Sequence, residues 1–259
     1  MTVAILEIAG LRLGIEGPGY PALDAFAVSG DAAPEFTVEV ALDPGRAPAE
    51  AIAPQVRTGR QGPRLFYKGV GSTGEIDLER RRARFLTFPE NEHLDGFLRF
   101  LVSTLLLERG SLLLHAAGVV WGLRGYVFLG PSGAGKTTIA SLAERRGARV
   151  LGDEVVAARK VGEQVSLWGT PFGSHGQRAG APGMAPLAAF CLLEKGQVPS
   201  FQKLAAATTA RALLRHAIAA PGIVPPATLL DTAVALSRSC PGGTLSFTLD
   251  PSFLEVLPR

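Results

Sequence analysis

Alternating polar and apolar positions divide the chain into a β-rich first part and a mixed second part. In the first 90 residues, runs of strand-forming residues predict strands at 3–13, 36–42, 64–68 and 84–88. The glycines of 71–74 predict a turn between the last two strands. A stretch rich in Pro, Gly and Ala predicts a long irregular connection within 41–62. We therefore expect a β-rich N-terminal domain at residues 1–90.

The second part opens with the most regular amphipathic pattern of the sequence. Apolar residues from Leu94 to Leu105 recur at helical spacing, Asn91 suits the N-cap position, and Gly110 follows the pattern. This pattern predicts a helix over 91–109 that connects the first domain to a second domain at 91–259.

Longer apolar runs in the second part predict buried strands at 112–121, 126–129, 148–155, 187–193 and 245–249, and a hairpin spanning 157–168. Helical spacing predicts amphipathic helices at 136–146, 204–220 and 229–239. The segment 169–186 is rich in Gly and Pro and holds Ser174, His175 and Arg178. We interpret it as a candidate substrate loop with Arg178 as a phosphate clamp; a plain mobile loop is the alternative.

One stretch of the second part carries a specific motif. It fits the pattern G-x-x-x-x-G-K-[ST] and consists of Gly130, Pro131, Ser132, Gly133, Ala134, Gly135, Lys136, Thr137 and Thr138. A predicted strand precedes it and a predicted helix follows it, which is the context of a phosphate-binding loop. Loop and helix N–H groups would bind phosphate, Lys136 would reach the terminal phosphates, and the Thr137 hydroxyl would hold Mg²⁺. A glycine-rich turn that binds nothing is the alternative.

Two adjacent carboxylates, Asp153 and Glu154, lie at the end of the strand predicted after this helix. If the two strands are neighbours, the carboxylates lie close to the phosphate loop, where an Mg²⁺ ligand or a base belongs. Alternation along a strand would send them to opposite faces and give them different roles. His115 interrupts the apolar run 112–121 and is either a core residue or a catalytic one. Solvated turn acids are the alternative for the pair.

Composition and charge exclude several classes of protein. Hydrophobic content of 47%, charged content of 19% and a net charge of +3 describe a globular chain without the basic surface of a nucleic-acid binder. Cys191 and Cys240 are too few for a disulfide framework and lack metal-ligand spacing. No signal peptide or membrane span is visible, so we expect a cytoplasmic protein. The first part of the chain also groups four arginines, Arg80, Arg81, Arg82 and Arg84. They would form either a docking patch for an acidic partner or a solvated hairpin tip.

Missing motifs narrow the class of nucleotide-binding protein. Asn91 is the sole Asn, so the Asn-Lys-x-Asp motif of GTPases is excluded, and neither the ABC-type signature nor the protein-kinase motifs occur. The remaining order of motifs resembles the HPr kinase/phosphorylase superfamily, whose nucleotide core is similar to that of ATP-dependent phosphoenolpyruvate carboxykinase. The resemblance covers about 112–156 and is carried by 114–119, 130–137 and 149–154.

The resemblance implies an α/β fold with a P-loop nucleotide-binding core of this type beside the β-rich N-terminal part. It also implies that one acid serves the metal, that the other takes the proton of the substrate serine, and that the strand histidine lies close by. The order of the motif assigns Mg²⁺ to Asp153 and the proton to Glu154, with His115 as the histidine. The family's Asp-Asp is Asp-Glu here, and its Glu-x-Arg-Gly-x-Gly stretch is missing, so phosphorylase activity and HPr as substrate are not expected.

These features predict an ATP- and Mg²⁺-dependent kinase that phosphorylates a serine-type hydroxyl on a peptide or protein. A nucleotide-binding sensor or assembly module without turnover is one alternative, and a kinase for a small molecule such as free serine is another. We expect no nucleic-acid or membrane partner, and self-association stays open.

Overall fold

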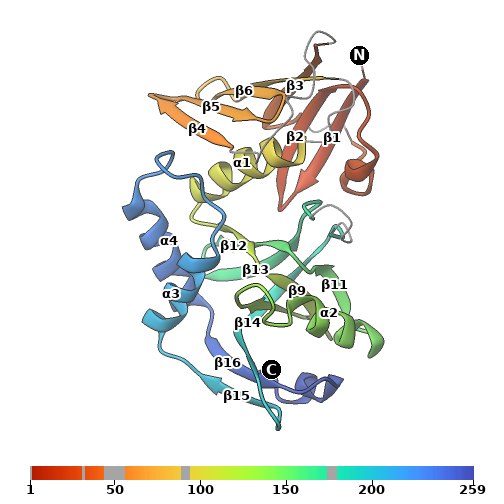
Figure 1. Ribbon diagram of the computed structural model, residues 1–259, viewed down its shortest axis with the longest axis vertical. Coiled ribbons are helices and arrows are strands. Elements are labelled where there is room, and N and C mark those ends of the chain that lie inside the picture. The colour runs from red at the N-terminus through yellow and green to blue at the C-terminus, as the bar shows by residue number, and fades with distance from the viewer. Residues whose placement is uncertain (1, 31–32, 44–55, 89–93, 174–179) are drawn as a thin grey trace. The chain divides into compact units, whose positions relative to one another are not determined.

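The computed structural model describes residues 2–30, 33–43, 56–88, 94–173 and 180–259 (Figure 1). These residues form two compact units, one made of Met1–Leu105 and Ala219–Pro225 and the other of Leu106–Ile218 and Pro226–Arg259. This division differs from the one expected at residue 90, because most of the connecting helix belongs to the first unit and a late segment joins it. Among the described helices, none has the length and apolar character needed to cross a bilayer.

A mixed seven-stranded sheet forms most of the first unit and has the order β1-β2-β3-β7-β6-β5-β4. Its parallel pairs are β2 with β3 and β3 with β7, and its other pairs are antiparallel. The strands are β1 Thr2–Ile8, β2 Leu11–Gly17, β3 Phe36–Leu42, β4 Arg57–Gln61, β5 Arg64–Gly69, β6 Ser72–Asp77 and β7 Arg82–Thr87, and a short 3₁₀ helix, η1, spans Pro21–Phe26.

Two tight turns and one edge strand differ from the predictions for this unit. The expected strand 3–13 is a hairpin, because Ala9 and Gly10 both have positive φ (52° and 70°) and form a two-residue turn between β1 and β2. The turn expected at 71–74 lies instead at Val70 and Gly71, and β6 begins directly after it. Strand β4 was not predicted, since its sequence is polar and lies on the edge of the sheet.

Helix α1 (Leu94–Leu107) covers one face of this sheet. Phe97 packs on the rings of Tyr67 and Phe85, with centroid distances of 5.5 and 4.8 Å. A Cβ at Gly74 would lie 2.2 Å from the Phe97 ring, so β6 can pass under α1 only because residue 74 has no side chain. The predicted helix start at 91 lies outside the described residues. The late segment of this unit is held by the Arg60 guanidinium, which donates to the Ile223 carbonyl at 2.7 Å.

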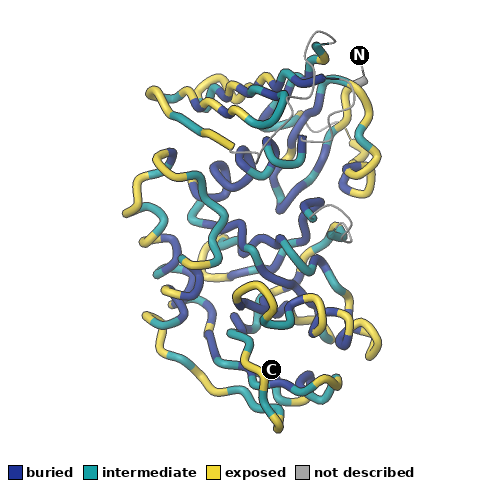
Figure 2. The backbone as a smooth tube through the Cα atoms, in the orientation of Figure 1, coloured by how far each residue is buried: buried dark blue, intermediate teal, exposed yellow. Residues whose placement is uncertain are grey.

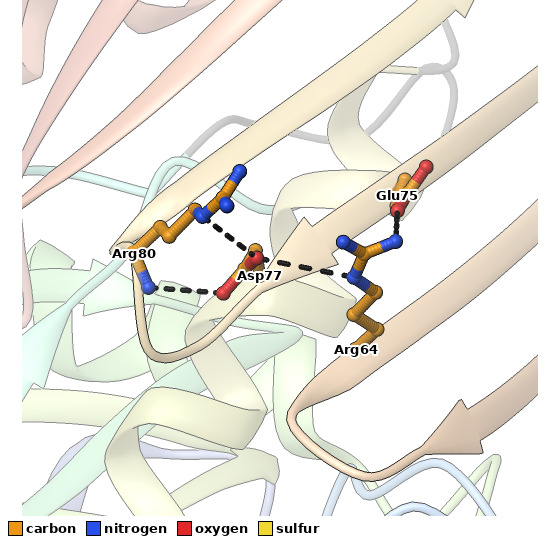
Figure 3. A network of polar contacts seen from close by, with 4 residues as sticks. All are labelled: Arg64, Glu75, Asp77 and Arg80. Carbon is orange, nitrogen blue, oxygen red and sulfur yellow. Dashed lines mark hydrogen bonds and ion pairs between the residues drawn. The ribbon is translucent and has the colours of Figure 1, made fainter.

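The arginine-rich hairpin between β6 and β7 is paired with acids along the other face of the sheet. Arg64 contacts Glu75 and Asp77, and Arg80 contacts Asp77 through both its backbone N–H and its guanidinium (Figure 3). Further along, Arg82 lies 3.4 Å from Glu16, and Arg84 lies 3.6 Å from Glu39. These exposed pairs contribute little stability each. They do balance the positive charge, which favours the solvated hairpin over a docking patch for an acidic partner.

The second unit is built on a nine-stranded mixed sheet with the order β11-β9-β10-β14-β13-β12-β8, extended by β16 beside β14 and β15 beside β16. Its strands are β8 Leu112–His115, β9 Ala117–Trp121, β10 Arg124–Leu129, β11 Arg149–Gly152, β12 Val155–Val161, β13 Gln164–Gly169, β14 Met184–Lys195, β15 Ser200–Lys203 and β16 Gly242–Phe247. Its helices are α2 Lys136–Arg145, α3 Ala206–His216, α4 Pro226–Ser239 and the 3₁₀ turn η2 Pro251–Glu255.

Two departures from the predicted strands matter for the site. The expected strand 112–121 breaks at Ala116 into β8, which pairs with β12, and β9, which pairs with β10 and β11. Strand β14 is longer than expected: its first part pairs with β13, and its later part lies between β10 and β16. Met184–Pro186, expected as part of a loop, therefore belong to the sheet.

The core of the second unit lies between α2 and the central strands. Ile139 and Ala143 of α2 pack with Phe128 and with Phe253 of η2, and all four are fully buried. Gly147, with φ of 87°, ends the helix as predicted, because the N–H groups of Gly147 and Ala148 donate to the carbonyls of Glu144 and Ala143. Figure 2 shows buried strands running through each unit and exposed residues concentrated at turns.

Candidate functional site

The loop 130–135 connects the end of β10 to the start of α2, as the sequence predicts. Gly133 and Gly135 have φ of 77° and 103°, values that side-chain-bearing residues rarely adopt. A Cβ at Gly130 would lie 2.6 Å from the Ala134 Cβ. The three glycines of the motif are therefore required by the backbone itself. Ser132 of the loop and Thr137 and Thr138 of the first turn of α2 are exposed to solvent.

The N-terminus of α2 has the features of an anion-binding site. Its N-cap residue is Gly135, which offers no side-chain cap, and the first helical bond runs from the Ile139 N–H to the Gly135 carbonyl at 2.8 Å. The N–H groups of the first helical turn are thus left to bind solvent or a ligand. Together with the helix dipole they favour a negatively charged group.

Lys136 is buried, with only 8% of its surface exposed. Its Nζ donates to the carbonyls of Gly130 (2.9 Å) and Pro131 (3.2 Å), so it closes the loop on itself. Burial lowers the pKa of Lys136, and the nearby Glu154 carboxylate opposes that effect. The Lys136 ammonium group therefore lies between the loop carbonyls and the Glu154 carboxylate. A bound phosphate could replace the two carbonyls as its hydrogen-bond partner.

Sheet topology brings the acid pair to the same end of the sheet as the loop, although not as neighbours. Strands β10 and β11 both run antiparallel to β9, which lies between them, so their C-terminal ends share one edge. Phe128 pairs with Ala117 and Gly152 pairs with Gly118, which puts the two strand ends about 10 Å apart at the ordinary strand spacing. The two strands are therefore not neighbours, which was the condition attached to the prediction, but the Glu154 carboxylate still acts on the pKa of Lys136.

Asp153 and Glu154 lie in the bend between β11 and β12, not within a strand. Strand alternation therefore does not separate their side chains, contrary to the prediction. The bend is fixed by backbone contacts on both sides: the Ala116 N–H donates to the Glu154 carbonyl at 2.9 Å, and the Thr170 hydroxyl donates to the Val155 carbonyl at 2.7 Å. Both carboxylates are half-buried, so they remain open to a ligand.

His115 is the last residue of β8 and pairs with Val155, the residue that follows Glu154. It is half-buried, unlike the fully buried leucines that precede it in β8. The histidine, the acid bend and Lys136 thus meet at one edge of the sheet.

Sequence reasoning missed a second histidine of this site, His216 at the end of α3. Burial and then the charges of Lys136, His115 and Arg215 lower the pKa of His216, so His216 lies near the start of α2 and near the other histidine. No spacing signal marks His216, because α3 begins about 70 residues after α2 begins and comes near these residues only through the fold.

The glycine- and proline-rich segment is described only at its two ends, and Arg178, Ser174 and His175 lie outside the described residues. Gly169 donates to the Gly183 carbonyl, and Ala181 donates to the Leu151 carbonyl, two residues before Asp153. A Cβ at Gly169 would approach the Ala181 carbonyl oxygen to 1.8 Å, so only glycine permits this crossing. The two described ends of the segment therefore lie close to the residues that flank the acid bend.

One pocket of the second unit lies away from the candidate residues. An open, mostly apolar pocket of about 820 Å³ lies at the opposite end of the strands, next to Trp121 and Arg149, and holds none of the candidate residues. In the described part of the chain, no group of three or more His, Cys, Asp or Glu side chains could hold a metal. A metal here would need phosphate and water as further ligands, which is the usual situation for Mg²⁺.

Comparisons with known proteins give a likeness in structure but none in sequence. No model of a protein family matches the sequence, and a search of curated proteins finds no match. A solved structure of the Hpr(Ser) kinase/phosphatase from Coxiella burnetii is similar over 56% of this chain and 92% of its own, with 12% sequence identity and a TM-score of 0.33. A likeness of this degree is silent on activity and substrate, so the proposals below depend on the residues of this chain.

Proposed function

We propose that this protein is an ATP- and Mg²⁺-dependent kinase that transfers the γ-phosphoryl group to a serine-type hydroxyl on a peptide or protein. One observation carries the proposal: a buried lysine at the start of α2 lies against the carbonyls of its own glycine loop, with a carboxylate within electrostatic range. Phosphoryl transfer requires this combination of phosphate binding and a nearby base, and little covalent chemistry from the protein.

Binding of the triphosphate is assigned to the loop 130–135, Lys136 and the first turn of α2. The loop's N–H groups would contact the β- and γ-phosphates, and the Lys136 ammonium would exchange its two carbonyl partners for phosphate oxygens. The Thr137 hydroxyl and the Asp153 carboxylate would hold Mg²⁺, which neutralises charge on the phosphates. Both are oxygen donors open to solvent at the same edge, which suits a hard cation.

Glu154 is assigned the role of general base. The acceptor hydroxyl oxygen forms a bond to the γ-phosphorus, its proton passes to the Glu154 carboxylate, and the bond to the β–γ bridging oxygen breaks to release ADP. His115 lies beside the acid bend and would orient the carboxylate or the acceptor. A serine acceptor is supported by the motif order, which resembles that of the HPr kinase/phosphorylase superfamily.

Mass spectrometry of acceptors incubated with ATP, Mg²⁺ and the protein tests the activity. Serine-containing peptides and free serine are offered together, and a phosphorylated peptide is the expected product. Phosphoserine as the free amino acid would favour the small-molecule kinase. ATP binding without any product would favour the nucleotide sensor, and both results would overturn the proposed acceptor.

Calorimetric titration with ATP and Mg²⁺ tests the phosphate site separately. Lys136→Ala removes a charge-assisted contact, so binding should weaken by about 1.5–3 kcal/mol, or about 10- to 150-fold. Lys203→Ala is the matched control, because it removes an exposed lysine from β15. Equal affinity in wild type and Lys136→Ala would remove the loop from the proposal.

A further inference from the structure

The end of α3 is joined to β8 by backbone contacts. Ala217 forms an isolated antiparallel bridge with Leu114, and the Ile218 N–H donates to the Leu113 carbonyl at 2.8 Å. The bridge holds the C-terminal end of α3, of which His216 is the last residue, against the end of β8, of which His115 is the last residue. This contact is on the side of β8 opposite to β12 and Val155.

His216 is half-buried and surrounded by basic groups. Burial and then Lys136 from α2, His115 from β8 and Arg215 from α3 itself all lower the pKa of His216 from its usual value of 6.5. A carboxylate, Glu154, also acts near this site, where its negative charge raises the pKa of Lys136. At neutral pH the His216 imidazole is therefore uncharged in the free protein.

Resting on the proposed function, we propose that His216 is a further ligand for the terminal phosphates of the nucleotide and that it takes up a proton as the nucleotide binds. The cations that keep the imidazole neutral in the free protein would be offset by the negative charge of the phosphates. A protonated imidazole offers two N–H donors, where a neutral one offers one. The site would thus gain a positive charge only when the anion that needs it is present.

Calorimetric titration with Mg²⁺ and a non-hydrolysable ATP analogue, at pH 7 in two buffers of different ionisation enthalpy, measures the protons taken up. The wild-type protein should take up protons on binding, to a maximum of about one proton per nucleotide bound. His216→Gln should abolish this uptake and weaken binding about tenfold, as expected for the loss of one charged hydrogen bond. His216→Arg, with a permanent charge, should keep wild-type affinity, show no uptake and lose the pH dependence of binding between about pH 6 and 8.

Two matched variants locate the proton. Arg215→Gln removes a neighbouring exposed cation but leaves the imidazole, so uptake should persist. Proton uptake should persist in His115→Gln as well, because this variant also leaves the His216 imidazole in place. Uptake that survives in His216→Gln, or that disappears in His115→Gln alone, would overturn the inference while leaving the kinase proposal intact. Wild-type protein that does not bind the analogue would instead overturn the proposed function.

Thermal unfolding of each variant shows whether it is folded. If His216→Gln does not fold, His216→Arg decides the question, since proton uptake in that variant would contradict the assignment to His216.

Discussion

Replacing Gly135 by alanine tests whether the loop backbone is set by its glycines. Gly135 has φ of 103° and caps α2, and an added Cβ would lie 2.7 Å from Phe247 Cζ. The Phe247 ring has little room to move, because it is 2% exposed and packs edge-on against Phe253 at 6.5 Å. Backbone strain of about 1–2 kcal/mol and overpacking of about 1–3 kcal/mol give an expected loss of about 2–5 kcal/mol.

Gly133→Ala is the matched control. Gly133 has φ of 77°, yet an added Cβ would meet nothing within 4 Å, so only the backbone strain of about 1–2 kcal/mol remains. Guanidinium unfolding followed by tryptophan fluorescence is a suitable assay. Both tryptophans of the chain, Trp121 and Trp168, belong to the second unit, so the signal reports on the unit that holds the loop.

The difference between the two glycine variants, about 1–3 kcal/mol, measures the contact with Phe247. Shortening that side chain in Phe247→Leu should reduce the cost of Gly135→Ala, and the double-mutant cycle gives the coupling. If both alanine variants lose the same free energy and no coupling is found, the close approach of Gly135 to Phe247 is not a determinant of stability.

Three further predictions concern other side chains of the second unit. His115→Ala should lower phosphoryl transfer by about 10²–10⁴-fold with little change in ATP affinity or melting temperature; a destabilised but fully active variant would make it a core residue. Asp153→Asn should raise the Mg²⁺ concentration required, whereas Glu154→Gln should lower turnover at near wild-type ATP affinity, and identical losses of stability alone would contradict both roles. Burial raises the pKa of Cys191 and, to about 12, that of Cys240, so a thiol reagent should modify both only after unfolding, and rapid labelling of the native protein would contradict this.

The conformation of the loop 130–135, between a strand and a helix, was predictable from sequence because its signals are local. Gly130, Gly133 and Gly135 are fixed by backbone geometry, and the flanking strand and helix follow from short apolar runs. The stop of α2 at Gly147 is equally local, since it depends on one residue with positive φ. The hairpin β12–β13, predicted at 157–168, was also predictable because its signals are local.

Features that depend on long-range pairing were missed. Nothing in the run 112–121 marks the break at Ala116, because β8 and β9 are both apolar and differ only in their partners. The position of β9 between β10 and β11 could not be predicted either, because it depends on which strands pair and not on their own sequences. His216 reaches the site through a bridge to β8 at a separation of about 100 residues, so no spacing rule could find it.

The discontinuous first unit has a consequence for the order in which the protein is made. Ile223, to which Arg60 donates and which is 1% exposed, emerges from the ribosome after most of the second unit. At about 5–20 residues per second, the segment Ala219–Pro225 follows Leu105 by on the order of 10 s. The seven-stranded sheet can therefore pair early, but the first unit gains its last segment only after most of the second unit has been synthesised.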